Sequence, residues 1–254
     1  MFFELVVFLL GASLGSFLMV WAERGSFLRA VTGRSMCAHC KTTLPPLHLV
    51  PVLSWLGLRG RCGYCKRSIS LAYPLFEAGL GLALALLWVS LIGPDATLAD
   101  AHAWSVFARD VFFTLSLALL FLFDLRRGLL PDRITLPAIV IALVWNLLLG
   151  KDVGDLLWGM LLVGGFFLIQ YLVSKGRWVG GGDIRMGALM GAMLGLVGGI
   201  QALFVAYIVG AVVALILLAE GRATKKTALP FGTFLAVAGY IVLVWGEELL
   251  ALVF

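Results

Sequence analysis

The chain has 254 residues, of which 62% are hydrophobic and only 13% are charged. A fold of this size keeps much of its surface in water, so one water-soluble core cannot bury that many apolar side chains. Composition therefore excludes a soluble globular protein and indicates an integral membrane protein. The net charge of +5 requires no nucleic acid as a partner, because a basic face toward the anionic lipid of a bilayer explains it.

Runs of about 20 apolar residues are typical of helices that cross a bilayer. Nothing in the chain alternates at the period of two that membrane strands show. We therefore expect an all-α polytopic membrane protein with about eight transmembrane helices. The expected spans are 2–22, 73–93, 104–123, 134–150, 153–174, 184–199, 201–219 and 230–253. Between the sixth and seventh, "GLVGGIQAL" fits either a tight turn or a break within one helix.

The first span is expected to be retained, since "MFFELVVFLL" lacks the positively charged start and the cleavage site of a secretory signal. Charge then gives the orientation of the spans. All Lys and Arg residues except Arg109 and Lys151 lie in four segments on one side: 23–72, 124–133, 175–185 and 220–229. The positive-inside rule makes that side cytoplasmic and places both termini on the other side.

All four cysteines lie in the one sizeable polar segment, 23–72. They form "CAHC" (Cys37, Cys40) and "CGYC" (Cys62, Cys65), two C-x2-C pairs separated by 21 residues. Each pair can supply two thiolates to one tetrahedral ion, as in a zinc ribbon. The alternative is two disulfides, which a reducing cytoplasm disfavours. Four cysteines close the coordination sphere, so a zinc ion here is predicted to be structural, and catalysis must lie elsewhere.

Two carboxylates at the cytoplasmic ends of spans are the candidates for catalysis. Asp124 closes the third span in "FLFDLRRGLLPD", and Asp183 opens the sixth in "GGGDIRM". Taken singly, Asp183 fits a helix N-cap, and Asp124 fits a solvated carboxylate beside two arginines. As a pair, one acid can hold a proton while the other activates water, which is how an aspartic protease works. The helix dipole favours Asp183 as the base and Asp124 as the holder of the proton.

Three further features depend on the spans. Glu77, one turn into the second span, is expected to pair with a basic residue at the cytoplasmic edge or to face the bundle interior. Asp110 is expected to form a local ion pair with Arg109. Glycines recur every four residues in the sixth span, which indicates close helix packing; they are Gly187, Gly191 and Gly195.

The segments "GGGDIRMGALMGAMLG", "FDLRRGLLPDRITLP" and "CAHC…SWLGLRGRCGYCKRSISLAYPLFE", together with "GASLGSFL" in the first span, resemble the bacterial prepilin peptidases. These are bifunctional membrane enzymes of type IV pilus and type II secretion systems. The "GGGD" segment is also similar to the G-x-G-D pattern of presenilin-type intramembrane aspartic proteases. The resemblance covers nearly the whole chain. The chain departs from the family pattern at Met19, Leu49 and Ala72, which lie outside both aspartate motifs.

The resemblance implies a multi-pass protein of the bacterial inner membrane that cleaves the short basic leader of prepilin or pseudopilin substrates at the cytoplasmic face. It implies Asp124 and Asp183 as the catalytic pair and a capping or turn role for Asp132. It also implies N-methylation of the new N-terminus with S-adenosylmethionine as the methyl donor. The expected domains are a first helix (1–22), a cytoplasmic four-cysteine zinc domain (23–72) and a membrane peptidase domain (73–254).

Two other classes of function remain open from the residues alone. A transporter would use the two aspartates to relay protons or cations, but the carboxylates lie at one face rather than at the membrane centre. A non-enzymatic zinc-bearing scaffold for a secretion machine explains the cysteines and leaves the aspartates without a role.

Overall fold

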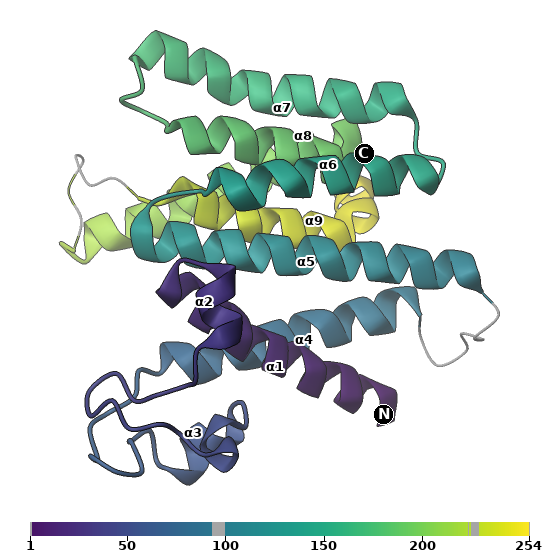
Figure 1. Ribbon diagram of the computed structural model, residues 1–254. Helices are drawn as coiled ribbons and strands as arrows, with labels where there is room; N and C mark the ends of the chain where they lie inside the picture. The colour runs from purple at the N-terminus through teal and green to yellow at the C-terminus, as the bar shows by residue number, and fades with distance from the viewer. Residues whose placement is uncertain (1, 93–99, 223, 225–228, 254) are drawn as a thin grey trace. The chain divides into compact units, whose positions relative to one another are not determined.

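The computed structural model describes residues 2–92, 100–222, 224 and 229–253. Across these residues the chain forms nine α-helices, one 3-10 helix and no β-strand (Figure 1). The bounds are α1 (Phe2–Arg24), α2 (Phe27–Thr32), η1 (Pro46–Leu49), α3 (Leu53–Gly57), α4 (Ala72–Leu91), α5 (Ala101–Arg127), α6 (Asp132–Leu148), α7 (Val153–Ser174), α8 (Gly181–Ala219) and α9 (Phe231–Val253). The expected all-α architecture is confirmed.

The chain divides into two compact units, Met1–Thr97 and Leu98–Phe254. Unit 1 contains α1 to α4, and unit 2 contains α5 to α9. The helix α4 therefore groups with the cysteine-bearing segment that precedes it, whereas the sequence places it with the later helices.

Within unit 1, small residues bring α1 and α4 into backbone contact. A Cβ atom added at Gly11 would lie 2.8 Å from the Cα atom of Gly81, and one at Gly15 would lie 3.1 Å from the Cα atom of Glu77. Helices in lipid associate largely through such close packing. The hydrophobic effect does not drive them together, because lipid tails are as apolar as the helix surfaces. The glycines of "GASLGSFL" thus serve to fix α4 against α1.

Within unit 2, the two arms of α8 fold back on each other at Gly195, which has φ 76° and ψ −168°. A Cβ atom added at Gly199 would lie 3.4 Å from the Cα atom of Gly191, whereas a continuous helix separates such residues by about 12 Å. The expected sixth and seventh spans are therefore the two arms of a hairpin. The three regularly spaced glycines Gly187, Gly191 and Gly195 all pack closely on α7, as expected, and Gly195 also makes the turn.

Polar side chains from other helices hold the hairpin turn. The Asp155 carboxylate accepts a 3.0 Å hydrogen bond from the Leu196 N–H. The fully buried Asn146 amide donates to the carbonyl oxygens of Ala192 (2.8 Å) and Met193 (3.1 Å). Arg109 in turn donates to the Asn146 side chain, and its ion pair with Asp110, at 2.7 Å, confirms the local pair expected from the sequence.

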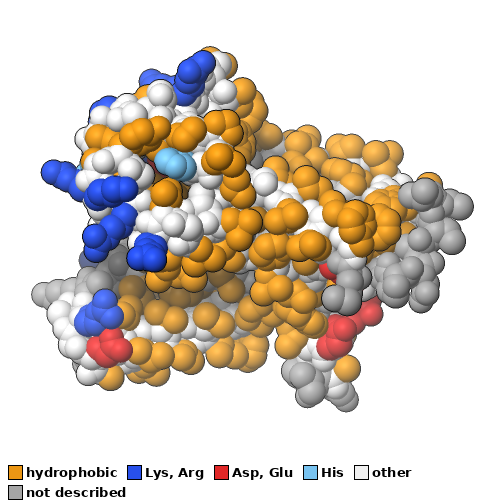
Figure 2. Space-filling view, turned by 90° about the horizontal axis from the view of Figure 1, so that it is seen from below, with side chains coloured by type: hydrophobic (Ala, Val, Ile, Leu, Met, Phe, Trp, Pro, Cys, Tyr) orange, Lys and Arg blue, Asp and Glu red, His pale blue; other side chains and the backbone are white. Residues whose placement is uncertain are grey.

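Six of the described helices are long and apolar enough to cross a bilayer: α1, α4, α5, α7, α8 and α9. The expected count of about eight also includes α6, which has 17 residues, and the second arm of α8. Many apolar side chains on these helices remain exposed, such as Leu148 at 80%. Figure 2 shows the result on one face, where hydrophobic side chains cover a broad area. The chain is a multi-pass membrane protein.

Candidate active site

Asp124 lies in the last turn of α5. Arg126 and Arg127 close the helix, and Gly128 adopts the left-handed conformation that ends it, with its N–H donating to the Asp124 carbonyl oxygen at 2.7 Å. The Asp124 side chain is only 6% exposed. A carboxylate at this depth requires polar partners, because burial of an unpaired charge is costly.

Those partners come from the start of α9. The Thr233 N–H donates a 2.7 Å hydrogen bond to Asp124 Oδ2, and the Gly232 N–H also interacts with this carboxylate. A Cβ atom added at Gly232 would lie 2.9 Å from Asp124 Oδ2, so only glycine leaves room for this approach. A helix N-terminus presents free N–H groups and partial positive charge to an anion. Asp124 thus lies at the end of one helix and the start of another.

Asp183 lies in the first turn of α8, three residues after the N-cap Gly180. Its Oδ2 atom accepts a 2.8 Å hydrogen bond from the Gly180 N–H, while its own N–H donates to the Gly180 carbonyl oxygen at 3.1 Å. The Asp183 carboxylate thus supplies one half of a capping box; the other half is absent because Gly180 has no side chain to accept from the N3 N–H. The N-cap role considered from the sequence was therefore placed three residues too late.

The buried side chain of Leu130, in the loop between α5 and α6, connects the two aspartate segments. A Cβ atom added at Gly182 would lie 3.1 Å from Leu130 Cβ, and one added at Gly232 would lie 3.1 Å from Leu130 Cδ1. Gly182 precedes Asp183, and Gly232 contacts Asp124. The negative charge of Asp183 acts on the Asp124 carboxyl group. Figure 1 shows the end of α5 and the start of α8 at the same end of unit 2.

Asp132 has a different role from the capping or turn role implied by the resemblance. It is the first residue of α6, and its carboxylate forms a 2.7 Å ion pair with Arg185 on α8. Its side chain is 54% exposed. Asp132 therefore ties the start of α6 to the start of α8, two residues from Asp183.

The site residues predicted from the sequence did not include Thr233, Gly232 or Leu130. The available signal was "LPFGT" immediately before an apolar run, since a proline and a glycine at a helix start leave N–H groups free for an anion. The pairing of this segment with Asp124, 109 residues earlier, depends on tertiary packing and leaves no local pattern.

In unit 1 the four cysteines come together as two turns of the same shape. Lys41 follows the first C-x2-C pair and Lys66 the second. Both adopt φ near 60° (57° and 58°), and each donates its N–H at 3.0 Å to the carbonyl oxygen of the first cysteine of its pair. The repeated geometry turns all four thiols toward one point.

The four sulfur atoms lie within 4.8 Å of one another. The Cys37 and Cys65 sulfur atoms are 3.8 Å apart, about the separation of two thiolates bound to one tetrahedral zinc at about 2.3 Å. A disulfide requires a separation of about 2 Å, and all four cysteines are free. The donor set and its spacing therefore fit a tetrahedral metal ion.

Hydrogen bonds prepare two of these thiols for metal binding, which requires thiolates. The Thr42 side chain lowers the pKa of the Cys40 thiol to about 6 by hydrogen bonding to its sulfur. The backbone N–H of Cys65 lowers the pKa of the Cys62 thiol.

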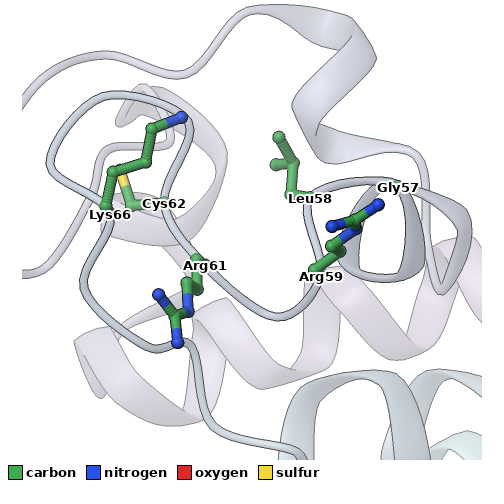
Figure 3. Close-up of a pocket in the computed structure, with 6 residues that line it drawn as sticks. All are labelled: Gly57, Leu58, Arg59, Arg61, Cys62 and Lys66. Atoms are coloured by element: carbon green, nitrogen blue, oxygen red, sulfur yellow. The ribbon is translucent and has the colours of Figure 1, made fainter.

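A hollow of about 500 Å³ beside this cluster is basic (Figure 3). Arg59, Arg61 and Lys66 surround it, together with Cys62. Positive charge next to thiolates stabilises them. The same positive charge would repel a basic peptide, so this hollow is unsuited to bind one.

The fold and site together define a class: a polytopic helical membrane protein with two acidic side chains at one end of a helical unit and a four-cysteine cluster in another unit. Comparison with known protein families matches residues 9–91 to the "Bacterial Peptidase A24 N-terminal domain" and residues 111–215 to the "Type IV leader peptidase family". The chain belongs to the type IV leader peptidase family.

Curated relatives agree with this membership. The chain is 35% identical over 223 residues to a prepilin leader peptidase/N-methyltransferase of Aeromonas hydrophila, covering 85% of this chain and 73% of the relative. It is 32% identical over 226 residues to the protein of the same name from Stutzerimonas stutzeri, with the same two coverages. A third, from Burkholderia pseudomallei, is 35% identical over 226 residues, covering 84% of this chain and 67% of the relative. No solved structure matches the chain.

Proposed function

We propose that this chain is a membrane-embedded aspartic endopeptidase that removes the leader of prepilin-like substrates, with Asp124 and Asp183 as the catalytic pair. The observation that carries the proposal is that the two aspartate segments, which lie on separate helices, pack on the same side chain: Leu130 contacts Gly182, next to Asp183, and Gly232, which contacts Asp124. Family membership and the printed names of the relatives support the same reaction. They give no support to the transporter or to the non-enzymatic scaffold.

The proposed chemistry needs one proton shared by two acids. A water molecule between the carboxyl groups attacks the carbonyl carbon of the scissile amide, and the ionised carboxylate takes a proton from that water. The protonated carboxyl donates its proton to the carbonyl oxygen. The C–N bond then breaks as the amide nitrogen accepts a proton, which yields a carboxylate on the leader and a free amine on the product.

The glycines before Asp183 supply space rather than unusual backbone angles. None of Gly180, Gly181 and Gly182 has a positive φ, and a Cβ atom added at Gly181 would meet no atom within 4 Å. An extended substrate backbone can therefore approach the acids on this side. The basic hollow of unit 1 is unsuited to the basic leader, because like charges repel.

We assign the site to the cytoplasmic face of the bacterial inner membrane. The basis is that almost all Lys and Arg residues flank the same ends of the spans as the two aspartates. The substrates would be pilins or pseudopilins whose apolar helix lies in the bilayer beside the leader.

We propose two further components. Cys37, Cys40, Cys62 and Cys65 would hold one structural zinc ion, which would fix the fold of the cytoplasmic segment. As the relatives are named N-methyltransferases, the new amine would then be methylated. In that step the amine nitrogen bonds to the methyl carbon of S-adenosylmethionine, the carbon–sulfur bond breaks, and the amine loses a proton to a base.

Cleavage of a prepilin-like substrate by the purified protein in lipid nanodiscs tests the peptidase. Asp124→Asn and Asp183→Asn should each lower the cleavage rate about 100- to 10,000-fold, the usual contribution of a general acid or base. Asp132→Asn, a carboxylate at the same end of unit 2, should retain activity within about tenfold of wild type because it acts through an exposed ion pair. Cleavage by either catalytic variant at the wild-type rate would refute the proposal.

A further inference from the structure

The segment between α1 and α4 in unit 1 is strongly basic. It has seven Lys and Arg residues and no Asp or Glu between residues 25 and 71. The two flanking acids are already engaged: Glu23 accepts a hydrogen bond from the Tyr73 hydroxyl. The buried Glu77 accepts one of 2.8 Å from the Val52 N–H, not from a basic side chain as one interpretation of the sequence expected. A zinc ion with four thiolates carries a net charge of about −2, so even the metal-bound segment stays positive.

Both ends of this segment meet the bilayer at the same surface. The helices α1 and α4 are long and apolar enough to cross a bilayer. Their glycine contacts pair later residues of α1 with earlier residues of α4, so the two helices run antiparallel. The end of α1 at Arg24 and the start of α4 at Ala72 therefore lie on the same side of the bilayer. The segment is thereby held close to the lipid headgroups of that side.

The short helix α3 in this segment turns its one aromatic side chain inward. The Trp55 indole N–H donates to the Ile69 carbonyl oxygen at 3.1 Å, and a Cβ atom added at Gly60 would lie 2.7 Å from the Trp55 ring. Trp55 also lines a cavity of about 640 Å³ inside unit 1, between the ends of α1 and α4 and the segment that joins them. Packing thus fixes which side of α3 faces inward.

A second face of α3 exposes leucines. Leu53 and Leu56, three residues apart on one face of the helix, are 61% and 58% exposed, and Leu47 in η1 is 80% exposed. These residues lie outside the helices that are able to cross a bilayer, so the hydrocarbon interior does not explain their exposure. Large apolar side chains exposed together mark an interaction surface.

Basic side chains lie beside these leucines. Arg59 (φ 53°) and Gly60 (φ 65°) are both left-handed and turn the chain back where α3 ends. The end of α3, at Gly57, lines the basic hollow of about 500 Å³, and Figure 3 shows Arg59 and Lys66 on opposite sides of it. Arg59, Arg61 and Lys66 are exposed, and no ion pair joins them to any residue that the structure describes. Their charge is available to an external anion.

We propose that α3 and the basic hollow beside it dock on the anionic phospholipids of the bilayer that α1 and α4 cross. The docking surface consists of Leu47, Leu53, Leu56, Arg59, Arg61 and Lys66. It has the composition of an interfacial helix, whose apolar side chains enter the headgroup region while Lys and Arg contact lipid phosphates. Nucleic acid would match the charge but not the leucines, and a basic leader would be repelled. Docking of this kind is independent of the peptidase chemistry.

Photolabelling of the full chain in lipid nanodiscs tests this docking. Two phospholipid probes carry the same photoreactive group near the glycerol and differ in headgroup, one being anionic phosphatidylglycerol and the other zwitterionic phosphatidylcholine. Mass spectrometry of the digested protein should show that residues 47–66 take up the anionic probe preferentially, by about fivefold for each basic side chain that contacts lipid. The helices α1 and α4 should take up both probes equally.

Two triple variants with the same loss of charge locate the preference. Arg59→Gln, Arg61→Gln and Lys66→Gln together should abolish the preference for the anionic probe in residues 47–66. The matched control replaces three other exposed basic residues of the same segment and should keep most of the preference; its changes are Arg29→Gln, Arg34→Gln and Lys41→Gln.

A separate variant tests the apolar half of the surface. Leu53→Ser with Leu56→Ser should lower labelling of residues 47–66 by both probes about tenfold, because the side chains that enter the headgroup region are lost. Both leucines are exposed, so the Tm of this variant should equal that of wild type.

Three results would overturn the proposal: equal labelling of residues 47–66 by the two probes in wild type, equal loss of preference in the two triple variants, or label confined to α1 and α4. The comparison of probes on wild type requires no substitution, so it remains decisive if a variant fails to fold.

Discussion

Asp124 and Asp183 are each held by backbone N–H groups at the start of a helix. From the sequence, Asp183 was predicted at a helix start and Asp124 at a helix end, and both placements are confirmed. The structure adds the start of α9, where the Thr233 N–H meets the Asp124 carboxylate. The helix dipole thus acts favourably on both acids. It no longer distinguishes the base from the holder of the proton.

At the same scale, Gly232→Ala tests whether the approach of α9 to Asp124 matters. The new methyl group would lie 2.9 Å from Asp124 Oδ2 and must displace the carboxylate. A shift of about 1 Å in a catalytic group lowers rates by roughly 100-fold, so kcat for leader cleavage should fall by about that factor. Gly165→Ala, where an added Cβ meets no atom within 4 Å, should leave kcat unchanged. An unaffected Gly232→Ala enzyme would show that this contact is dispensable.

Among the elements, the hairpin of α8 was predicted only in part from sequence patterns. Apolar length and the glycines of "GLVGGIQAL" predicted either a turn or a broken helix, and the turn at Gly195 settles the choice. The sequence could not specify which glycine turns, because the groups that hold the turn, Asp155 and Asn146, come from α7 and α6. The regular glycine spacing correctly indicated close packing at all three positions, since Gly195 also lies against Gly159 of α7, but it did not show that Gly195 makes the turn.

Gly195→Ala should destabilise this hairpin. The backbone at φ 76° and ψ −168° belongs to a region that only glycine adopts readily, at a cost of about 1–3 kcal/mol for other residues. An added Cβ would also lie 2.0 Å from Asp155 Oδ2. Thermal unfolding in detergent should show a lower Tm for Gly195→Ala than for wild type, with Gly165→Ala as the control. Equal Tm values for the two variants would argue against a strained turn at this residue.

For the whole molecule, composition predicted a helical membrane protein, and charge asymmetry predicted its orientation. The two units, 1–97 and 98–254, correspond closely to the two family matches, 9–91 and 111–215. The domain boundary expected from the sequence follows the cysteine segment. The sequence does not reveal the glycine contacts that hold α4 against α1. The cysteine spacing predicted the four-thiol cluster well, since all four ligands lie in one short segment. The cavity of unit 1 left no sequence signal, because its lining depends on how that segment folds over two helix ends.

Removal of the metal should affect the two units differently. Purified wild type should contain about one zinc per chain, and Cys37→Ser with Cys40→Ser should contain none, because two thiolates cannot complete a site that needs four cysteine ligands. The variant should become sensitive to limited proteolysis within 23–72, since short metal domains unfold without their ion. Elemental analysis and peptide mapping measure both effects. A metal-free wild type with a protease-resistant segment would contradict the structural role of zinc.

The dependence of two acids on each other is most directly measured by a double-mutant cycle on single-turnover leader cleavage, with Asp124→Asn, Asp183→Asn and both together. Residues that act as one unit give non-additive losses. If the pair activates one water molecule jointly, the double variant should cleave no more slowly than the slower single variant. Losses that multiply across the two substitutions would show that the carboxylates act independently and would contradict a shared catalytic centre.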